Sequence, residues 1–296
     1  MRLAVTGSRG QLASALLEVA QARGAEVVTL CRPRFDLADA PSVAETIGGL
    51  DADVLINAAA YTAVDRAETE EAAAFAANAH GAGFVARACA ARGMPIIHVS
   101  TDYVFDGRKN APYVETDFTS PLCVYGRSKR DGEEQVARAC AEHIILRTAW
   151  VHSPFGANFV KTMLRLGKER DEISVVNDQL GTPTYAPHLA EAIVTIAQRM
   201  LAEPASIAWG VYHCANDGEA TWHDVAVAAF QSSLALGGQF ACVRPMPSSA
   251  YPVAAKRPMN SRLDSTKLAG AFDVRLPAWQ DGVKLGVARL LAAEGG

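Results

Sequence analysis

The sequence predicts an α/β protein built on a doubly wound parallel sheet. Short apolar runs alternate with segments of helical periodicity over the first half of the chain. A turn that contains glycine follows the first apolar run and leads into the first helical segment. Strands that alternate with helices pair in parallel, because each helix carries the chain back to the start of the next strand.

Five short apolar runs are the expected strands of this sheet. They cover residues 2–6, 26–30, 53–56, 95–99 and 143–147. Helices are expected where apolar side chains recur every three or four residues or where alanine predominates. These segments cover residues 10–23, 68–91 and 121–141. Residues 1–150 are therefore expected to form one domain.

The composition changes after residue 150. Helices and strands there are interspersed with loops rich in Pro, Asn and Asp, such as residues 177–184 and 248–264. No repeat and no low-complexity linker separates this part from the first. We expect a smaller C-terminal α/β lobe over residues 151–296, with an approximate boundary and elements that can interleave.

The composition excludes several classes of protein. Half of the 296 residues are apolar and a fifth are charged, which excludes a disordered or collagen-like chain. The 28 basic and 32 acidic residues give a net charge of −4 without a basic stripe, so nucleic-acid binding is not expected. No apolar run reaches the roughly 18 residues of a membrane-spanning helix, and the N-terminal run is too short for a signal peptide.

The cysteines and histidines do not predict a metal site. The six cysteines form no C-x-x-C pair, and the seven histidines show no spacing to them that is typical of zinc sites. We expect reduced, mostly buried thiols in a cytoplasmic protein.

The turn after the first strand has the spacing of a phosphate-binding loop. Gly7, Gly10 and Ala13 form the pattern G-x-x-G-x-x-A. The first glycine allows a tight turn, the second lets backbone N–H groups approach a pyrophosphate, and the small third residue lets the helix pack on the sheet. The pattern is weak by itself, but its place between the first strand and the first helix predicts a Rossmann-type dinucleotide site.

The tip of the second expected strand bears on the choice of dinucleotide. An acidic side chain at this place binds the ribose hydroxyls of NAD, whereas arginine can face the 2′-phosphate of NADP. This chain has Arg32 and Arg34 there. We expect NADPH as the cofactor, with NADH as the alternative if both arginines are only solvated. Asp36 and Leu37 follow and are expected to cover the adenine.

The third expected strand leads into small residues. Ala60, Tyr61 and Thr62 follow it closely. Small side chains at the carboxyl end of a strand leave room for a cofactor that crosses the sheet edge. The Thr62 hydroxyl is a candidate for a hydrogen bond to the ribose or phosphate.

Tyr125 and Lys129 are the expected proton-transfer pair. Residues four apart on a helix share one face, so the ammonium of Lys129 is expected near the phenol of Tyr125 and near the nicotinamide ribose. A nearby cation lowers the pKa of a phenol, and Tyr125 can then protonate a nascent alkoxide while hydride arrives from the nicotinamide. Thr101, at the end of the fourth strand, is expected to hydrogen-bond the carbonyl oxygen. A purely structural Tyr–Lys pair is the alternative.

Two further features carry weaker expectations. Trp150 ends the fifth strand at the sheet edge where ligands bind, whereas the other tryptophans are expected in the core. The cluster of Glu68, Glu70 and Glu71 is expected to be a solvated helix face.

Together these residues resemble the extended short-chain dehydrogenase/reductase superfamily, and within it the dTDP-4-dehydrorhamnose reductase family. Motifs over nearly the whole chain carry the resemblance, at residues 100–107, 120–129, 146–152, 158–166, 175–184, 221–224 and 257–264. The later motifs are more specific than the glycine loop or the Tyr–Lys pair. The resemblance implies NAD(P)H-dependent reduction of the C4 ketone of dTDP-4-dehydro-L-rhamnose. It also implies a place at the last step of a pathway that supplies rhamnose to cell-surface polysaccharide.

The resemblance also implies roles for individual residues. Tyr125 corresponds to the general acid, Lys129 to its partner and Thr101 to the hydrogen bond on the carbonyl side. The residues implied for the pyrophosphate are Gly10, Gln11 and Leu12, and those lining the cofactor are Ala60, Tyr61 and Thr62. The residues implied for the substrate are Asp102 and Trp150 at the sugar and Asn158, Gln179 and Arg257 toward the diphosphate.

Two departures from the family pattern affect these expectations. Some members have an acidic residue where this chain has Cys31 and Arg32, which favours NADPH over NADH here. Some members form dimers around a divalent cation held by a carboxylate early in the first helix. This chain has no carboxylate there before Glu18, so we expect no such metal and a monomer or a weak homodimer.

Other functions remain open at this point. The chain can act on another nucleotide-4-ketosugar, as a reductase, an epimerase or a dehydratase. It can also be a non-catalytic, cofactor-binding subunit of a partner enzyme. The intact set of Thr101, Tyr125 and Lys129 favours a catalyst.

Overall fold

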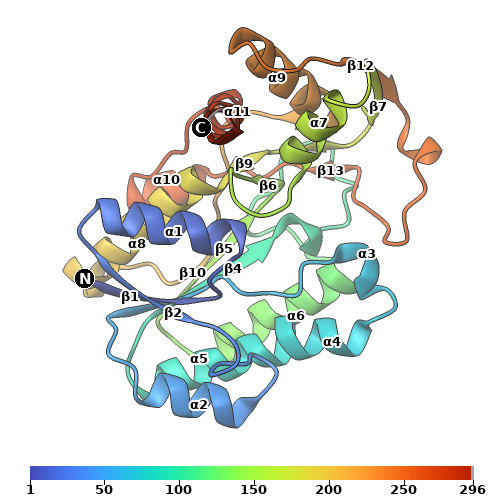
Figure 1. Ribbon diagram of the computed structural model, residues 1–296. Helices are drawn as coiled ribbons and strands as arrows, with labels where there is room; N and C mark the ends of the chain where they lie inside the picture. Colours follow the sequence, from blue (N-terminus) through green and yellow to red (C-terminus); the bar gives the residue numbers. More distant parts are fainter. Residues whose placement is uncertain (295–296) are drawn as a thin grey trace.

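A six-stranded parallel sheet forms the centre of the computed structural model, which describes residues 1–294 (Figure 1). In chain order its strands are β1 (Arg2–Thr6), β2 (Glu26–Leu30), β3 (Val54–Asn57), β4 (Ile96–Thr101), β5 (His143–Thr148) and β10 (Gly210–His213). They lie side by side in the order β10-β5-β4-β3-β1-β2. The five strands expected from the sequence are confirmed, and so is the doubly wound α/β fold.

Two apolar layers hold helices on the two faces of this sheet. Leu3 and Val5 of β1 point to one face and Ala4 to the other, as the two-residue period of a strand requires. The first face packs against α1 (Gln11–Ala22), α8 (Ala186–Ala202) and α10 (Thr266–Phe272). The second packs against α2 (Ala40–Gly48), α5 (Ala82–Ala91) and α6 (Val124–Ala139). Figure 1 shows α1 and α8 above the sheet and α2 and α5 below it.

The long alanine-rich helix expected over residues 68–91 is interrupted. It consists of α4 (Glu71–Phe75), a π-helical turn η1 (Ala76–Gly81) and α5, and the short α3 (Val64–Ala67) precedes it. The π-turn directs the buried Asn78 side chain to the backbone N–H and carbonyl of Tyr61, at 2.8 and 3.0 Å. Extra-residue turns of this kind commonly occur at functional sites, and this one holds the loop after β3.

The second half of the chain forms a smaller lobe above the carboxyl ends of the strands (Figure 1). Its helices are α7 (Phe159–Gly167), α9 (Trp222–Ala235) and α11 (Trp279–Glu294). Its short sheets pair β7 (Glu172–Val176) with β12 (Cys242–Met246), β6 (Val151–His152) with β9 (Thr184–Tyr185), and β8 (Leu180–Gly181) with β11 (Ala220–Thr221) and β13 (Asn260–Ser261). Single turns of 3₁₀-helix lie at Asp102–Val104 (η2), Pro204–Ser206 (η3) and Ser248–Ala250 (η4).

The chain does not stay in this lobe after residue 150. Both α8 and β10 return to the large sheet, where β10 pairs with β5 and α8 packs on α1. The division at residue 150 therefore remains a prediction about domains. Over residues 1–294, no helix is long and apolar enough to cross a membrane.

Candidate active site

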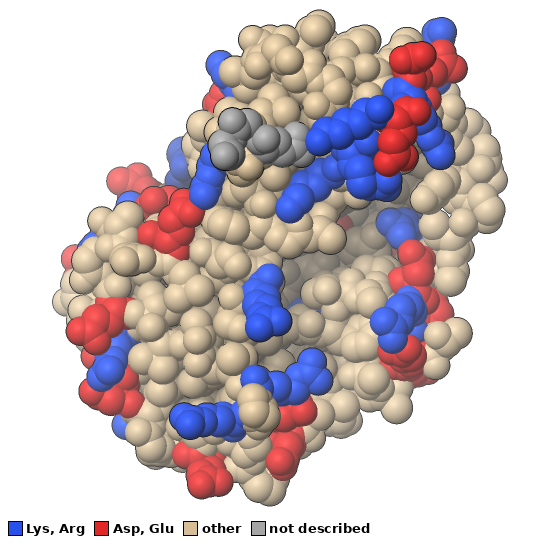
Figure 2. Space-filling view, viewed as in Figure 1, with Lys and Arg blue, Asp and Glu red and all other residues tan. Residues whose placement is uncertain are grey.

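A cleft of about 1410 Å³ follows the carboxyl ends of the strands and continues beneath the second lobe. Figure 2 shows the hollow on this face of the molecule, with Lys and Arg side chains along its rim. Most of the residues predicted from the sequence line it, namely Gly7, Gly10, Gln11, Leu12, Arg32, Asp36, Leu37, Ala60, Tyr61, Thr62, Thr101, Asp102, Tyr125, Lys129, Trp150 and Arg257. The fold thus brings together residues that lie far apart in the sequence.

The glycine loop at one end of the cleft has the geometry of an anion site. Gly7 has φ +87°, a conformation that favours glycine, and its N–H donates to the carbonyl of Leu30 at 2.7 Å. No side chain caps α1 at Gly10, so the first N–H groups of the helix are available to a ligand in the cleft. These groups and the helix dipole fit the pyrophosphate of a dinucleotide.

The side chain of Gln11 is used within the protein. Its amide donates to the carbonyl of Val151 at 3.2 Å and accepts from the hydroxyl of Ser153 at 2.9 Å. These bonds join the start of α1 to the second lobe. Only the backbone of Gln11 is therefore free to contact a phosphate.

Arginine side chains surround the far end of the cleft beside β2. Arg32 is exposed and lines the cleft, whereas Arg34 lies outside the lining. Arg9 in the glycine loop also lines the cleft and was not singled out from the sequence, although its place between the two loop glycines is a usable signal. Two guanidinium groups at this end fit a further phosphate on the adenosine side of a dinucleotide.

Tyr125 and Lys129 project from the first turns of α6 toward the end of β4. The start of α6 can lie directly against η2 because Gly126 has no Cβ atom. A Cβ atom there would come within 2.2 Å of the carbonyl oxygen of Tyr103. Thr101 hydrogen-bonds to Tyr125, and its hydroxyl donates to a carboxylate oxygen of Asp102 at 2.9 Å. Phenol, hydroxyl and carboxyl are therefore held in one group.

Lys129 is buried beside the backbone of β4. Its Nζ donates to the carbonyl of Val99 at 2.7 Å and lies 3.4 Å from Nε2 of His98. Burial lowers the pKa of Lys129 to about 8, and the carboxylate of Glu133, one helical turn away, acts in the opposite direction.

The pKa of Tyr125 differs from the sequence expectation. Burial raises it, the hydrogen bond with Thr101 acts in the opposite direction, and Lys129 does not lower it in this structure. The ammonium is directed to the carbonyl of Val99, which explains why its effect on the phenol is missing. A phenol with a raised pKa remains protonated at neutral pH, so Tyr125 carries a proton, and burial also makes it a weaker acid than a free phenol.

Asp102 is a buried carboxyl group with an unusual pKa. It is 2% exposed, and its Oδ2 atom has no hydrogen-bond partner. Burial raises its pKa to about 6, while hydrogen bonds with Ser261 and Thr101 act in the opposite direction. Ser261 belongs to β13 of the second lobe, so Asp102 lies where the two parts of the protein meet above the sheet.

This raised pKa predicts how Asp102 affects stability. The folded state binds a proton on Asp102 more tightly than the unfolded state, so Asp102 contributes most below about pH 4 and loses that contribution as the pH rises through about 6. Asp102→Asn is therefore expected to be about 3 kcal/mol more stable than the parent at pH 7, and about equal below pH 4. Denaturant unfolding measured across this pH range tests the difference.

Asp106 is the matched control for Asp102. The N–H of Arg108 holds the pKa of Asp106 below its usual value, so Asp106→Asn is expected to be less stable than the parent above about pH 4, with the difference disappearing as the pH falls below 4. Equal pH profiles for Asp102→Asn and the parent would contradict the assigned state of Asp102.

Trp150 and Trp222 form the roof of the cleft. Trp150 has φ +47°, a strained conformation for a residue with a side chain, and such strain clusters at functional sites. Its ring stacks on Trp222 with centroids 3.7 Å apart and planes 8° apart. Trp222 was expected in the core but lines the cleft, and its place at the start of α9 gave no periodic signal for that role.

Three residues assigned to the diphosphate side have different surroundings. Arg257 lines the cleft and pairs with Asp65 of α3 at 2.9 Å. Asn158 and Gln179 lie outside the lining. The Asn158 side chain caps α7, accepting the N–H of Lys161 at 3.1 Å and donating to the carbonyl of Ser153 at 2.8 Å. Gln179 is 8% exposed, in the turn between β7 and β8.

The acidic cluster near α3 and α4 is not simply a solvated face. Glu70 accepts a hydrogen bond from the phenol of Tyr61 at 2.6 Å. Glu68 accepts the N–H of Val124, in the first turn of α6, at 2.8 Å. These two carboxylates therefore hold parts of the cleft wall, and the expectation was wrong for them.

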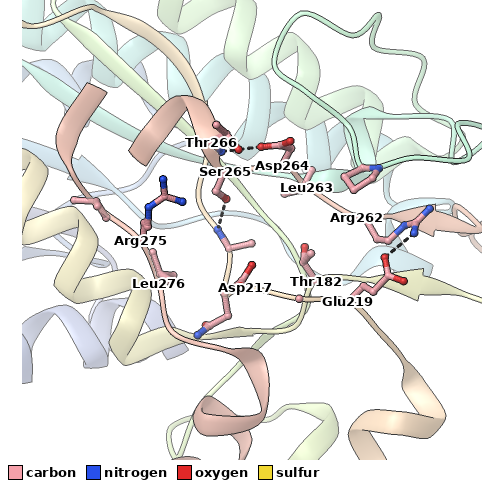
Figure 3. A pocket seen from close by; sticks show the side chains of 15 residues that line it. Thr182, Asp217, Glu219, Arg262, Leu263, Asp264, Ser265, Thr266, Arg275 and Leu276 are labelled. Atoms are coloured by element: carbon pink, nitrogen blue, oxygen red, sulfur yellow. Dashed lines mark hydrogen bonds and ion pairs between the residues drawn. The ribbon is translucent and has the colours of Figure 1, made fainter. Parts of the chain in front are cut away.

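A second, smaller cavity of about 400 Å³ lies between residues 215–219, residues 262–266 and residues 274–276 (Figure 3). Arg262 pairs with Glu219 at 2.6 Å on its wall, and Thr182, Asp217 and Arg275 also line it. None of the site residues predicted from the sequence lines this cavity. Among residues 1–294, no group of three or more His, Cys, Asp or Glu side chains could hold a metal ion.

The doubly wound sheet, the glycine loop and the Thr–Tyr–Lys group define an extended short-chain dehydrogenase/reductase. The chain belongs to the family described as RmlD substrate binding domain, whose model matches residues 1–292.

Relatives and solved structures agree with this membership. The chain is 48% identical over 285 residues to the dTDP-4-dehydrorhamnose reductase of Sinorhizobium fredii, covering 96% of each chain. It is 44% identical to the enzyme of that name from Escherichia coli, covering 84% of this chain and 83% of the relative. It also resembles the dTDP-4-dehydrorhamnose reductase of Bacillus anthracis solved in complex with NADP, with a TM-score of 0.90, 33% identity and coverage of 97% and 99%.

A more distant structure shares the fold alone. The UDP-glucose 4-epimerase of Thermus thermophilus superposes with a TM-score of 0.80 at 21% identity, covering 99% of this chain and all of that one.

Proposed function

We propose that this chain is a dTDP-4-dehydrorhamnose reductase, which reduces the C4 ketone of dTDP-4-dehydro-L-rhamnose to dTDP-L-rhamnose with NADPH. The observation that carries the proposal is the group of Thr101, Tyr125 and Lys129, which lies in the same cleft as the glycine loop. Relatives that bear this name span nearly the full chain and support the substrate. The reaction is the last step of dTDP-rhamnose biosynthesis.

The residues of the cleft divide the reaction between them. A reduced nicotinamide, when bound, supplies the hydride for the carbonyl carbon. Tyr125 donates its phenolic proton to the carbonyl oxygen, and Thr101, whose own hydroxyl proton is donated to Asp102, lies beside the phenol. Lys129 would hold the ribose of a bound nicotinamide through its ammonium group, which lines the cleft. Asp102, buried near Ser261, and Trp150, half-buried and stacked on Trp222, bind the sugar.

The remaining contacts in this proposal concern the two nucleotides. Gly10, Gln11 and Leu12 hold the pyrophosphate of the cofactor through backbone N–H groups, and Gly7 forms the tight turn that brings them to it. The other cofactor contacts are Arg32, Asp36, Leu37, Ala60, Tyr61 and Thr62. Arg257 binds the diphosphate of the substrate. Asn158 and Gln179 remain predicted contacts, and the capping bonds of Asn158 place it behind the cleft wall.

Arg32 tests the cofactor preference. Arg32→Ala is expected to weaken NADPH binding about tenfold, because one guanidinium contact to the 2′-phosphate is lost, and to leave NADH binding unchanged. Arg34→Ala is the matched control, since Arg34 is exposed nearby but does not line the cleft. Titration of both cofactors against both variants measures the difference, and an equal loss for NADPH and NADH would remove Arg32 from 2′-phosphate recognition.

The same proposal includes a cytoplasmic location and a monomer or weak homodimer without a bridging metal. All six cysteines are free thiols and four are buried, which supports a reducing compartment. Glu18 of α1 is paired with Arg289 of α11 in the same chain at 2.7 Å, which supports a carboxylate engaged within one molecule.

One assay tests the activity. NADPH absorbance is followed with purified protein and dTDP-4-dehydro-L-rhamnose made in situ from dTDP-glucose. Consumption that requires this protein, with dTDP-rhamnose as product, is the expected result. Protein that binds NADPH but consumes neither NADPH nor NADH would contradict the proposal and favour another ketosugar or a non-catalytic subunit.

A further inference from the structure

A buried chain of polar side chains runs across the sheet and ends at Lys129. The hydroxyl of Thr6 in β1 donates to Oδ1 of Asn57 in β3 at 2.8 Å. The carboxamide Nδ2 of Asn57 lies 3.0 Å from Nδ1 of His98 in β4, and Nε2 of His98 lies 3.4 Å from Nζ of Lys129. All four side chains are 2% exposed or less, and the two middle ones, Asn57 and His98, do not line the cleft.

The donors along this chain fix one another. The hydroxyl oxygen of Thr6 accepts the N–H of Ala59 at 2.9 Å, which leaves its proton for Asn57. Asn57 then donates to Nδ1 of His98, and the single proton of the neutral imidazole is on Nε2. That proton faces Lys129, which can accept it only as the neutral amine, with Nζ still donating to the carbonyl of Val99.

Rotation of the Asn57 carboxamide gives the second consistent arrangement. Its Nδ2 then donates to Thr6, its Oδ1 accepts a proton from Nδ1 of His98, and Nε2 of His98 becomes an acceptor. An acceptor at this position suits the ammonium form of Lys129. The two arrangements differ in where the protons lie and in which carboxamide atom of Asn57, Oδ1 or Nδ2, faces Thr6 and which faces His98. The other heavy atoms of the chain keep their positions.

His98 itself does not titrate near neutral pH. Burial and then the charge of Lys129 hold its pKa well below the usual value, so the imidazole remains neutral. The titratable groups whose charge acts on His98 and Lys129 are His143, Glu133 and Lys129 itself, and Tyr125 lies one helical turn before Lys129 on α6. Of these, Glu133 is the group that raises the pKa of Lys129. His98 therefore acts on Lys129 as a dipole that can be reversed.

We propose that His98, oriented by Asn57 and Thr6, is a positioning residue for Lys129, and that the tautomer of His98 changes together with the protonation of Lys129. The buried chain thereby holds Nζ in place in both states and couples β1, which leads into the glycine loop, to the proton-transfer group. Its meaning for catalysis rests on the proposed reductase function, whereas the coupling itself is a property of the protein alone.

Nuclear magnetic resonance of the cofactor-free protein tests the coupling directly. The ¹⁵N shifts of His98, assigned with His98→Gln, report its tautomer, and the ¹³Cε shift of Lys129, assigned with Lys129→Arg, reports its protonation. Between about pH 6 and pH 10, His98 is expected to pass from the Nδ1–H to the Nε2–H form with the same midpoint at which Lys129 titrates. A single tautomer throughout while Lys129 titrates, or an imidazolium, would overturn the proposal.

The pH profile of turnover is the second readout. Asn57→Asp accepts from both Thr6 and Nδ1–H of His98, which fixes the acceptor form toward the ammonium, so the alkaline limb is expected to move up by about one pH unit. Asn57→Leu releases the imidazole and is expected to move the limb down. His80→Gln, an exposed histidine of η1, is the control with no shift. Shifts in the same direction, or none, would contradict the proposal.

The two readouts separate this proposal from the proposed function. A coupled tautomer change in a protein that reduces no ketosugar would leave the coupling intact and refute the reductase. Reduction of the substrate by a protein whose His98 tautomer is constant would support the reductase and refute the coupling.

Discussion

Replacing Tyr125 with phenylalanine is expected to lower turnover by about 10²–10⁴-fold, the usual contribution of a positioned general acid. In the proposed reaction the phenol of Tyr125 is the proton donor, and the phenylalanine ring alone keeps the shape of the cleft. NADPH affinity is expected to stay nearly unchanged, because the glycine loop and Arg32 are untouched. Single-turnover absorbance and a binding titration measure the two quantities.

Tyr251 is the matched control for this change. It is 60% exposed and does not line the cleft, so Tyr251→Phe is expected to keep its turnover. Near-normal turnover in Tyr125→Phe would show that another group supplies the proton. Loss of NADPH binding in that variant would show instead that the phenol mainly holds the cofactor.

Arg147→Met is expected to lower the free energy of unfolding by about 3–5 kcal/mol, the cost of leaving one partner of a buried ion pair uncompensated. Arg147 in β5 and Glu133 in α6 are each no more than 7% exposed, and their two hydrogen bonds are 2.9 and 2.7 Å long. Glu133 also accepts from Ser100 of β4 at 2.5 Å. The pair thus fastens α6, which carries Tyr125 and Lys129, to the neighbouring strands β4 and β5.

Two further variants check this explanation. Arg147→Met combined with Glu133→Leu removes both charges and is expected to recover much of the loss, since an apolar pair can replace a buried ion pair. Arg138→Ala breaks an exposed pair with Glu134 on the same helix and is expected to cost no more than about 1 kcal/mol. Equal denaturant midpoints for Arg147→Met and Arg138→Ala would contradict the role given to the buried pair.

Much of the fold follows from local patterns that the sequence displays. The strands at residues 2–6 and 26–30 and the helix between them are apolar runs and periodic segments bounded by glycine, so each is specified by its own residues. Gly7 and Gly10 mark the phosphate loop for the same reason, because their spacing acts within a single turn. The pair Tyr125 and Lys129 also depends only on the pitch of one helix.

Three features of the structure differ from what the sequence led us to expect. The Asn158 side chain precedes an apolar helix and caps it, which is the usual signal of a helix start. The break of the alanine-rich segment at η1 had no clear marker, because alanine fits an α-turn and a π-turn equally well. Trp222 was expected in the core, but it lines the cleft, where its ring stacks on Trp150.

The sequence by itself determined the class of fold, the phosphate loop and the proton-transfer pair, because each depends on residues close together in the chain. Only the tertiary structure decided that Lys129 turns to Val99 and His98, that Arg147 meets Glu133, and that α8 and β10 return to the large sheet. These contacts join residues on different strands and helices. A buried polar group forms hydrogen bonds with the groups that tertiary packing places next to it. A pattern within one short segment of the sequence does not specify those groups.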